Sequence, residues 1–227
     1  MPILLGVAAA APAQEMTTSQ GWPEVDVWVS TGQFSRLFFL ATLTSQHVGE
    51  YSDGQFGVHL DLWLKNRRLK RMLQGVSDNM LQDRRHMASV RLGYRYAPVF
   101  SDSGTGTENR GIVEFTFRDD VPGAVLLSDR TRFDLRWIDG VYSTRVRNRV
   151  TLERDAHLFH RTLTPYGSAE LYYDSRYDTI NRDRFTVGVQ TTLSLFAMID
   201  TYFARQNDWR SQPAHLNALG VALNLSF

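Results

Sequence analysis

Three pairs of side chains in this sequence are of types that could carry out nucleophilic catalysis. A serine hydroxyl becomes a nucleophile when an adjacent histidine takes its proton and a third polar group orients that histidine. The pairs are Ser45 with His47, His59 with Asp61, and His157 with His160. None stands in a His-x-Ser-Asn-type motif, and the chain has no cysteine for a thiolate nucleophile, a thiolate zinc site or a disulfide. We interpret the pairs as ordinary strand residues and expect no catalytic, cofactor or metal site.

A larger set of residues could act through charge. Arginines and carboxylates recur at alternate positions, which places them on one face of a strand. The arginines are Arg91, Arg95, Arg110, Arg118, Arg130, Arg132, Arg136, Arg145, Arg147, Arg149 and Arg184; the carboxylates are Glu114, Asp134, Glu153, Glu170, Asp174 and Asp200. All except Arg118, Glu153 and Asp200 are predicted to line a pore.

This ionic face has two interpretations. A barrel of modest size can be filled by side chains, and arginine and carboxylate groups can then neutralise one another as a plug. Alternatively, the surplus of arginines could line a narrow anion-favouring passage or bind an anionic ligand, as rings of Arg and Lys do in anion pores. The alternation itself does not separate the two.

The elements that position these residues are strands. Segments of about ten residues with period-2 alternation are separated by clusters of Gly, Pro, Asp, Asn and Ser. The eleven segments are 24–31, 36–47, 55–65, 86–96, 109–118, 125–137, 142–153, 165–174, 182–195, 197–205 and 214–227.

Each segment has one apolar and one polar or small face. In the ninth, Phe185, Val187 and Val189 alternate with Thr186 and Gln190. In a soluble sandwich the apolar faces would pack in a core, whereas in an outer-membrane barrel they would face lipid.

Three observations favour the barrel. The segments match the tilted span of an outer membrane and exceed the usual soluble strand of about five or six residues. The chain ends on Phe227, which resembles the C-terminal signal of bacterial outer-membrane barrels. Aromatic residues gather near segment ends, where interfacial girdles lie: Tyr94, Tyr96, Trp137, Tyr142, Tyr172, Tyr173, Tyr202 and Phe203. We predict an all-β, antiparallel up-and-down transmembrane β-barrel.

The strand number and orientation follow from the connections. Both termini of such a barrel should be periplasmic, which requires an even number of strands. We therefore predict about 12 strands, with 10 as the fallback. The short connections near residues 32–33, 119–123 and 196 should be periplasmic, and the longer ones at 47–54, 99–108, 175–181 and 206–213 should be external.

The N-terminus predicts export. Residues 1–13 are apolar and small and close in Ala11-Pro12-Ala13, the form of a signal-peptidase site, although no basic residue precedes them. The apolar stretch is shorter than the roughly 20 residues of a spanning helix. We predict a signal peptide at 1–13, a barrel domain at 14–227 and an outer-membrane location in a diderm bacterium.

The overall charge argues against a nucleic-acid partner. Lys and Arg number 25 against 24 Asp and Glu, a net charge of +1, and the sequence contains no long run of one sign. Residues 65–85 are locally basic, with apolar residues near helical spacing. They could form a short basic helix at a membrane surface or barrel mouth, or a solvated turn.

Five stretches of the second half resemble a family of uncharacterised bacterial outer-membrane proteins, domain of unknown function 2490. They are SDRTRFDLRW (128–137), STRVRNRVTLERD (143–155), YGSAELYYD (166–174), NRDRFTVGVQTTLS (181–194) and HLNALGVALNLSF (215–227), joined by RLGYRYAP at 91–98. The resemblance implies a 12-stranded barrel of unknown activity. Residues 65–85 depart from the short turn expected there.

Together these observations predict a non-enzymatic outer-membrane barrel, structural or serving as a small-solute, anion-favouring pore. The expected partners are outer-membrane lipids, the barrel-assembly machinery through the strand ending at Phe227, and a small anionic solute, with no nucleic acid. The alternatives are a lipid-modifying barrel hydrolase and a soluble exported β-sandwich with a ligand cleft.

Overall fold

The computed structural model describes residues 17–47, 50–64, 84, 86–99, 106–158, 161–210 and 214–227. Within this part of the chain, no helix is long and apolar enough to cross a membrane. Twelve strands make up most of it, and each of the eleven predicted segments coincides with one of them. The strands are β1 (Thr17–Gly32), β2 (Ser35–His47), β3 (Glu50–Trp63), β4 (Ala88–Pro98), β5 (Thr107–Val121), β6 (Val125–Ile138), β7 (Val141–Arg154), β8 (Ala156–Leu158), β9 (Arg161–Asp174), β10 (Thr179–Thr192), β11 (Ala197–Asp208) and β12 (His215–Ser226).

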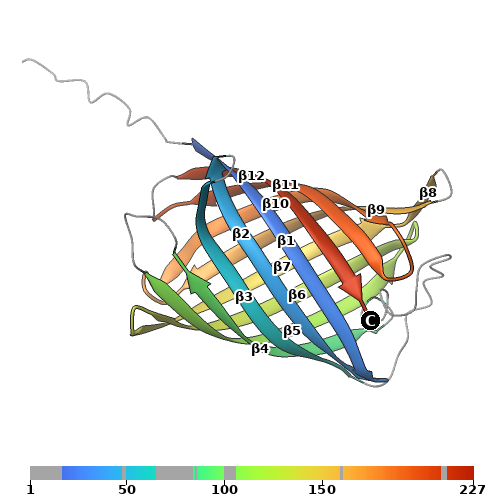
Figure 1. Cartoon of the computed structure of the whole chain (residues 1–227), viewed down its shortest axis with the longest axis horizontal. Coiled ribbons are helices and arrows are strands. Elements are labelled where there is room, and N and C mark those ends of the chain that lie inside the picture. Colours follow the sequence, from blue (N-terminus) through green and yellow to red (C-terminus); the bar gives the residue numbers. More distant parts are fainter. Residues whose placement is uncertain are drawn as a thin grey trace, which may run out of the picture.

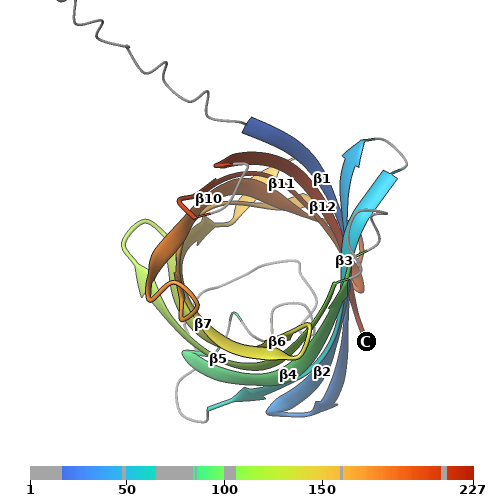
Figure 2. The ribbon, with the colours of Figure 1, turned by 90° about the vertical axis from the view of Figure 1, so that its left-hand side faces the viewer.

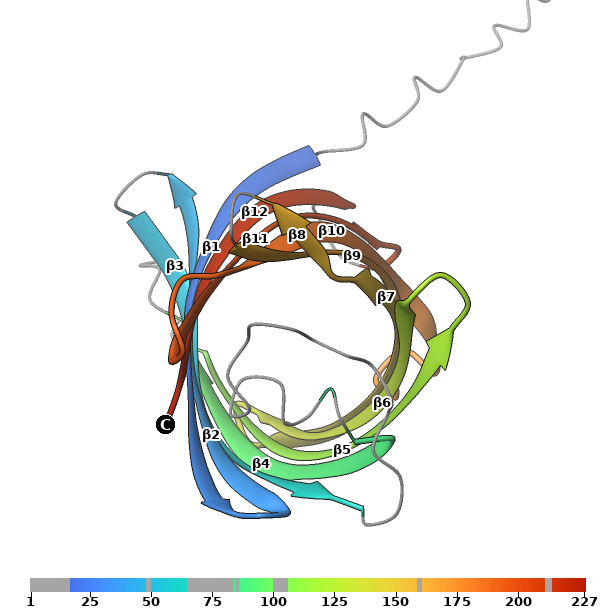
Figure 3. The ribbon, with the colours of Figure 1, turned by 90° about the vertical axis from the view of Figure 1, so that its right-hand side faces the viewer.

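The strands form one sheet that closes into a barrel (Figures 1 and 2). Each strand pairs with the next along the chain in antiparallel fashion, apart from β8, which is three residues long and pairs only with the start of β9. The ring is closed by β1 and β12, which pair in parallel from Thr17↔His215 to Trp28↔Ser226. Eleven strands therefore enclose the interior, which Figure 3 shows end-on.

The predicted barrel fold is confirmed, and the sheet contains twelve strands, but the closed ring has an odd number. The even count assumed that every neighbouring pair is antiparallel, and the parallel β1–β12 pair removes that requirement. As a result, β1 begins at one rim and β12 ends at the other (Figure 1). The expectation that both termini lie on the same side is wrong for the described strands.

Side chains alternate between the outer surface and the interior of the barrel. In β12, Leu219 and Val221 are 68% and 48% exposed on the outside, whereas Ala218 and Ala222 point inward and are buried. The apolar faces are thus turned outward. No second sheet of the described residues covers them, so the sandwich alternative is wrong for this chain.

The barrel has two rims. We call the rim where β1 begins the N-terminal rim; it also carries the β2–β3, β4–β5, β6–β7, β9–β10 and β11–β12 connections. The opposite, C-terminal rim carries Phe227 and the remaining connections.

The predicted division of connections by length holds only in part. At the N-terminal rim β6 and β7 are joined by Asp139 and Gly140 alone, whose φ values of 49° and 83° fit a two-residue hairpin turn. The long 64–87 connection lies at the C-terminal rim, among the short turns. Apart from Leu64, Arg84, His86 and Met87, that connection lies outside the described residues, as do residues 1–13, so neither the predicted basic helix nor the signal peptide is seen.

Aromatic side chains on the outer surface differ between the rims. The exposed Tyr and Trp residues of the described chain all lie toward the N-terminal rim: Tyr51, Tyr94, Tyr96, Trp137, Tyr142, Tyr173, Tyr177 and Trp209. At the C-terminal rim the exposed aromatic residues are Phe34, Phe117, Phe196 and Phe227. Two members of the predicted girdle, Tyr172 and Tyr202, point inward and line the interior instead.

Candidate functional site

The barrel interior contains an ionic network that follows the strand register. Residues that face each other on adjacent strands have side chains about 5 Å apart, so opposite charges placed there can pair. One such row crosses nine strands, from β2 to β7 and from β9 to β11: Arg36, Asp61, Arg91, Glu114, Arg132, Arg147, Tyr172, Arg182 and Asp208. The hairpins set this row, because the register of each strand pair decides which residues meet.

Asp61 begins the network on β3. Its carboxylate accepts a hydrogen bond from Arg36 Nε at 3.0 Å and two from Arg91, at 2.5 Å from Nε and 2.9 Å from Nη2. Arg36 and Asp61 are both buried. Two arginines thus share one carboxylate, and Arg91 also lies 3.9 Å from Glu114.

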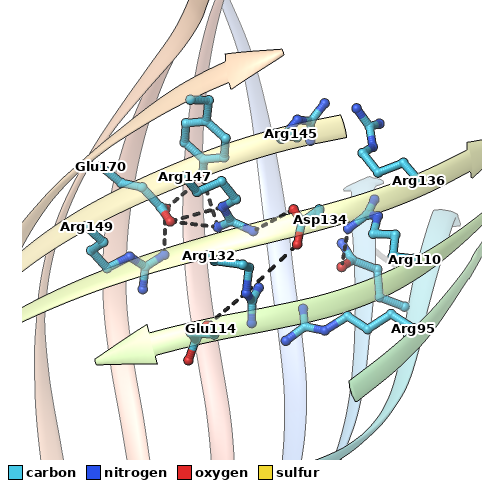
Figure 4. Close-up of polar contacts among 12 residues, drawn as sticks. Arg95, Arg110, Glu114, Arg132, Asp134, Arg136, Arg145, Arg147, Arg149 and Glu170 are labelled. Carbon is cyan, nitrogen blue, oxygen red and sulfur yellow. Dashed lines mark hydrogen bonds and ion pairs between the residues drawn. The ribbon is translucent and has the colours of Figure 1, made fainter. Parts of the chain in front are cut away.

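Glu170 on β9 is the centre of the network (Figure 4). It accepts hydrogen bonds from Arg149 Nη2 at 2.7 Å and Arg147 Nε at 3.1 Å, and from the Tyr172 hydroxyl at 2.7 Å. Arg147 reaches on toward Asp134, at 3.9 Å. On the other side of Asp134, Arg132 donates to Glu114 at 2.8 Å.

A second group of ion pairs lies near the N-terminal rim. Asp174, at the end of β9, accepts hydrogen bonds from Arg136 at 2.9 Å, Arg145 at 3.0 Å and Arg176 at 2.8 Å. The hydrogen bond from Arg176, which lies in the turn after β9, raises the pKa of the Arg176 guanidinium. Glu108 binds Arg110 and also Arg136.

Two inward arginines have no carboxylate within 4 Å among the described residues. Arg95 on β4 donates from Nε to His59 Nε2 at 3.1 Å. Arg184 on β10 donates to Gln206 Oε1, at 3.1 and 2.5 Å, and its guanidinium lies 4.9 Å from the Trp22 ring centre. Both line the central cavity.

That cavity has a volume of about 730 Å³ and a cationic surface. Its described lining includes five carboxylates, namely Glu24, Asp26, Asp53, Glu153 and Asp200, and thirteen arginines, namely Arg36, Arg84, Arg91, Arg95, Arg110, Arg118, Arg130, Arg132, Arg145, Arg147, Arg149, Arg182 and Arg184. Apart from Glu153, which pairs with Arg84 at 3.2 Å, the carboxylates of the ion pairs described above do not line it. Because Asp and Glu side chains are shorter than Arg, they lie against the barrel wall and the guanidinium groups extend past them.

The opposite side of the interior is built from small residues. The inward positions of β12 include Ala218, Gly220, Ala222, Asn224 and Ser226, and Ala204 on β11 is fully buried. Gly220 accommodates Tyr202 of β11, because a Cβ at that position would lie 2.0 Å from the tyrosine ring. Small residues here leave room for the cavity and for the inward tyrosine.

All fourteen predicted pore-lining residues point into the barrel. Nine of them line the cavity, and all nine are arginines: Arg91, Arg95, Arg110, Arg130, Arg132, Arg145, Arg147, Arg149 and Arg184. The other five are buried in the wall behind these: Glu114, Asp134, Arg136, Glu170 and Asp174.

Other members of the network were not predicted as pore-lining residues. The sequence does not identify Arg36, because β2 is apolar on both faces, with Phe38 inward and Phe39 outward, and its alternation does not mark the interior. Glu108 and Asp208 fell in predicted loops, whereas β5 and β11 extend over them. The sequence pattern pairs Asp61 with His59 and does not indicate its contacts with Arg36 and Arg91.

The candidate nucleophile and base residues do not assemble in the described part of the chain. His59 is buried against Phe38 and accepts from Arg95, while Asp61 pairs with Arg36 and Arg91. His157 is exposed and contacts Thr162 at 3.2 Å. The side chain of His47 and all of His160 lie outside the described residues. Among the described residues, no group of three or more His, Asp or Glu side chains is arranged to hold a metal ion.

Comparison with known proteins gives the family. No curated protein matches the sequence. Among solved structures, the β-domain of the Bordetella autotransporter BrkA is similar, with 11% identity and a TM-score of 0.43 over 86% of this chain and 82% of that one. A family model described as a protein of unknown function, DUF2490, matches residues 84–217, more than half of the sequence. The chain therefore belongs to the DUF2490 family.

Proposed function

We propose that this protein is an outer-membrane β-barrel whose interior passes small solutes and favours anions. The outward apolar faces support a membrane location, since large apolar patches on a protein surface normally meet a partner or a lipid phase. Phe185, Val187 and Leu195 on the outside of the barrel are 56%, 61% and 61% exposed. Closed barrels satisfy all backbone hydrogen bonds within the sheet, as a bilayer requires.

The aromatic residues near the rims support the same location. Tyr and Trp favour the boundary between hydrocarbon and water, because one end of the ring system is apolar and the other polar. Their restriction to the N-terminal rim among the described residues supports the position of that rim at one membrane interface. In this proposal the outer-membrane lipids contact the belt between the two rims.

The C-terminal strand supports the proposed contact with the barrel-assembly machinery. Phe227 is 58% exposed, and its backbone N–H donates to Trp28 O at 2.9 Å while its carbonyl accepts from Ser30 N at 2.8 Å. The end of β12 is thus fixed by hydrogen bonds to β1, while the ring of Phe227 stays on the outside, where a receptor could bind it.

The observation that carries the preference for anions is the charge of the cavity surface. Thirteen arginines line it against five carboxylates among the described residues. In a confined, partly desolvated passage, fixed positive charge raises the local concentration of anions and excludes cations. The proposal includes no catalytic step.

Two measurements test this function. The protein extracted from membranes should migrate differently on SDS gels with and without boiling, because closed barrels resist SDS until heated. Refolded into a planar bilayer with different KCl concentrations on the two sides, it should give single-channel currents. Their reversal potential should lie closer to the equilibrium potential of chloride than to that of potassium. A barrel that shifts on heating but conducts no ions would be the plugged, structural alternative and would overturn the pore proposal.

A further inference from the structure

Arg95 differs from the other arginines on its side of the barrel. The neighbouring Arg91, Arg132 and Arg147 each have a carboxylate within 4 Å, and Arg95 has none among the described residues. Yet the residue is only 8% exposed. An arginine stays charged in proteins, so a buried guanidinium without a fixed counter-ion requires another source of negative charge.

The position of this guanidinium is fixed by His59. Arg95 Nε donates to His59 Nε2, and the imidazole is stacked on Phe38 with ring centres 5.0 Å apart. The imidazole also lies over two glycines: a Cβ at Gly93 would be 2.1 Å from its Cδ2, and one at Gly57 would be 2.7 Å from its Cε1. With Nε held in this way, no described residue accepts a hydrogen bond from the two terminal nitrogens.

The surroundings of Arg95 are also short of negative charge. In the strand register Arg95 faces Arg110 on β5, which in turn faces Arg136 on β6. Like charges directly opposite one another destabilise a sheet. Glu108 binds both Arg110 and Arg136, and Asp174 is a second partner of Arg136, whereas neither carboxylate binds Arg95.

We infer that Arg95 is the binding site for a small oxyanion, a carboxylate or a phosphate, inside the barrel. The planar fork of a guanidinium matches two oxygens of either group, and hydrogen bonds between charged partners are the stronger ones. Figure 4 shows Arg95 on β4, near the paired Arg132 and Glu114. The inference rests on the proposed function, since the anion reaches Arg95 through the barrel mouth.

Arg184 provides a matched control. It too lines the cavity and lacks a carboxylate within 4 Å among the described residues, so replacing it by glutamine removes one positive charge without leaving an acid unpaired. It differs because Gln206 already accepts from both Nε and Nη2, and Trp22 and Tyr172 lie against the guanidinium. If all the arginines attracted the anion through a diffuse field, both glutamine variants would lose the same amount of anion affinity.

The experiment is a binding titration on the refolded full chain in detergent at low salt. Inorganic phosphate is followed by its ³¹P linewidth and acetate by its ¹³C linewidth, for the wild type, Arg95→Gln and Arg184→Gln. We expect saturable binding of at least one probe by the wild type, weakened about tenfold or more in Arg95→Gln and by less than about twofold in Arg184→Gln. Arg95→Lys keeps the positive charge but lacks the planar guanidinium fork, so its anion affinity should lie between those of the wild type and Arg95→Gln. A heat-dependent shift on SDS gels establishes that each variant is folded.

The outcomes separate the site from the pore. Equal weakening in both glutamine variants, or no saturable binding of either probe by the folded wild type, would overturn the site. Single-channel currents measured on the same preparations report the proposed function independently. Conduction without saturable binding would support the pore proposal and overturn the Arg95 site. Saturable binding without conduction would support the Arg95 site and overturn the pore proposal.

Discussion

Two opposite walls of the barrel interior are stabilised in different ways. The charged wall, formed by the inward side chains of β4–β7 and β9, is a network in which carboxylates such as Glu170 each hold several arginines. The small-residue wall, formed by the inward side chains of β12 with Ala204, contains no ion pair among the described residues. The first wall supplies fixed charge, and the second leaves the space in which that charge can act.

The difference between the two walls explains how a cavity and a dense array of charge lie side by side in the described interior. A barrel with two charged walls of this density would bring arginines together from both sides and fill the centre. A barrel with two small-residue walls would have no fixed positive charge in its interior. The observed arrangement keeps a cavity of about 730 Å³ beside a dense array of guanidinium groups.

Among the changes considered, removal of Glu170 from the charged wall should lower the free energy of unfolding the most. Glu170→Ala removes a buried carboxylate and leaves Arg147 and Arg149, whose side chains are 11% and 27% exposed, without their main counter-ion. Removal of one partner from a buried ion pair costs about 3–5 kcal/mol. The free energy of unfolding from lipid vesicles, measured by urea titration with tryptophan fluorescence, should fall by that amount. A loss below about 1 kcal/mol would mean that the network contributes little to stability.

The next largest effect should come from β12, where one strand separates the outer surface from the small-residue wall. Val221→Arg places a charge on the proposed lipid face and should cost about 2–4 kcal/mol near the bilayer midplane. Ala222→Arg, one residue away, points into the cavity between Asp200 and Glu24 and should cost much less. Equal losses in the same vesicle titration would contradict the assignment of the two faces.

A smaller loss should follow when the small-residue wall is overfilled. The Cβ in Gly220→Val would overlap the Tyr202 ring, which must move, and overpacking of this kind costs about 1–3 kcal/mol. The displaced ring should also narrow the cavity and lower the single-channel conductance. Gly220→Val in combination with Tyr202→Ala, which removes the ring, should restore most of the lost stability; failure to do so would refute the packing explanation.

The smallest effect should come from the rim of the charged wall. Arg176 pairs with Asp174 but lies in the exposed turn at the N-terminal rim, where ion pairs contribute about 0–1 kcal/mol. Arg176→Ala should therefore change the free energy of unfolding by no more than that, because Arg136 and Arg145 still hold Asp174. A larger loss of unfolding free energy would mean that the stabilising ionic network includes the turn that carries Arg176.

The amount that could be predicted differs between strands. For β6 the alternation of Phe133 and Leu135 with Arg132 and Asp134 was enough to assign both faces correctly. For β2, where Phe38 points inward and Phe39 outward, it was not, and Arg36 was missed. Alternation identifies a face only when the two sides of a strand differ in polarity.

The parallel closure was beyond prediction for a different reason. Pairing between β1 and β12 joins residues about 200 positions apart, and no turn between them fixes direction or register. In the hairpins a short connection does so, as Asp139-Gly140 does between β6 and β7. The odd number of strands in the ring follows from that one long-range pair.

The sequence by itself determined the strands, the outward apolar faces and the inward arginines, because these depend on residues two positions apart in one segment. Only the tertiary structure decided which carboxylate each arginine meets and which arginine is left without one. Those contacts depend on the register between strands and on side-chain length, which places Asp and Glu at the wall and guanidinium groups in the cavity. The isolation of Arg95 beside His59 is therefore a property of the closed barrel.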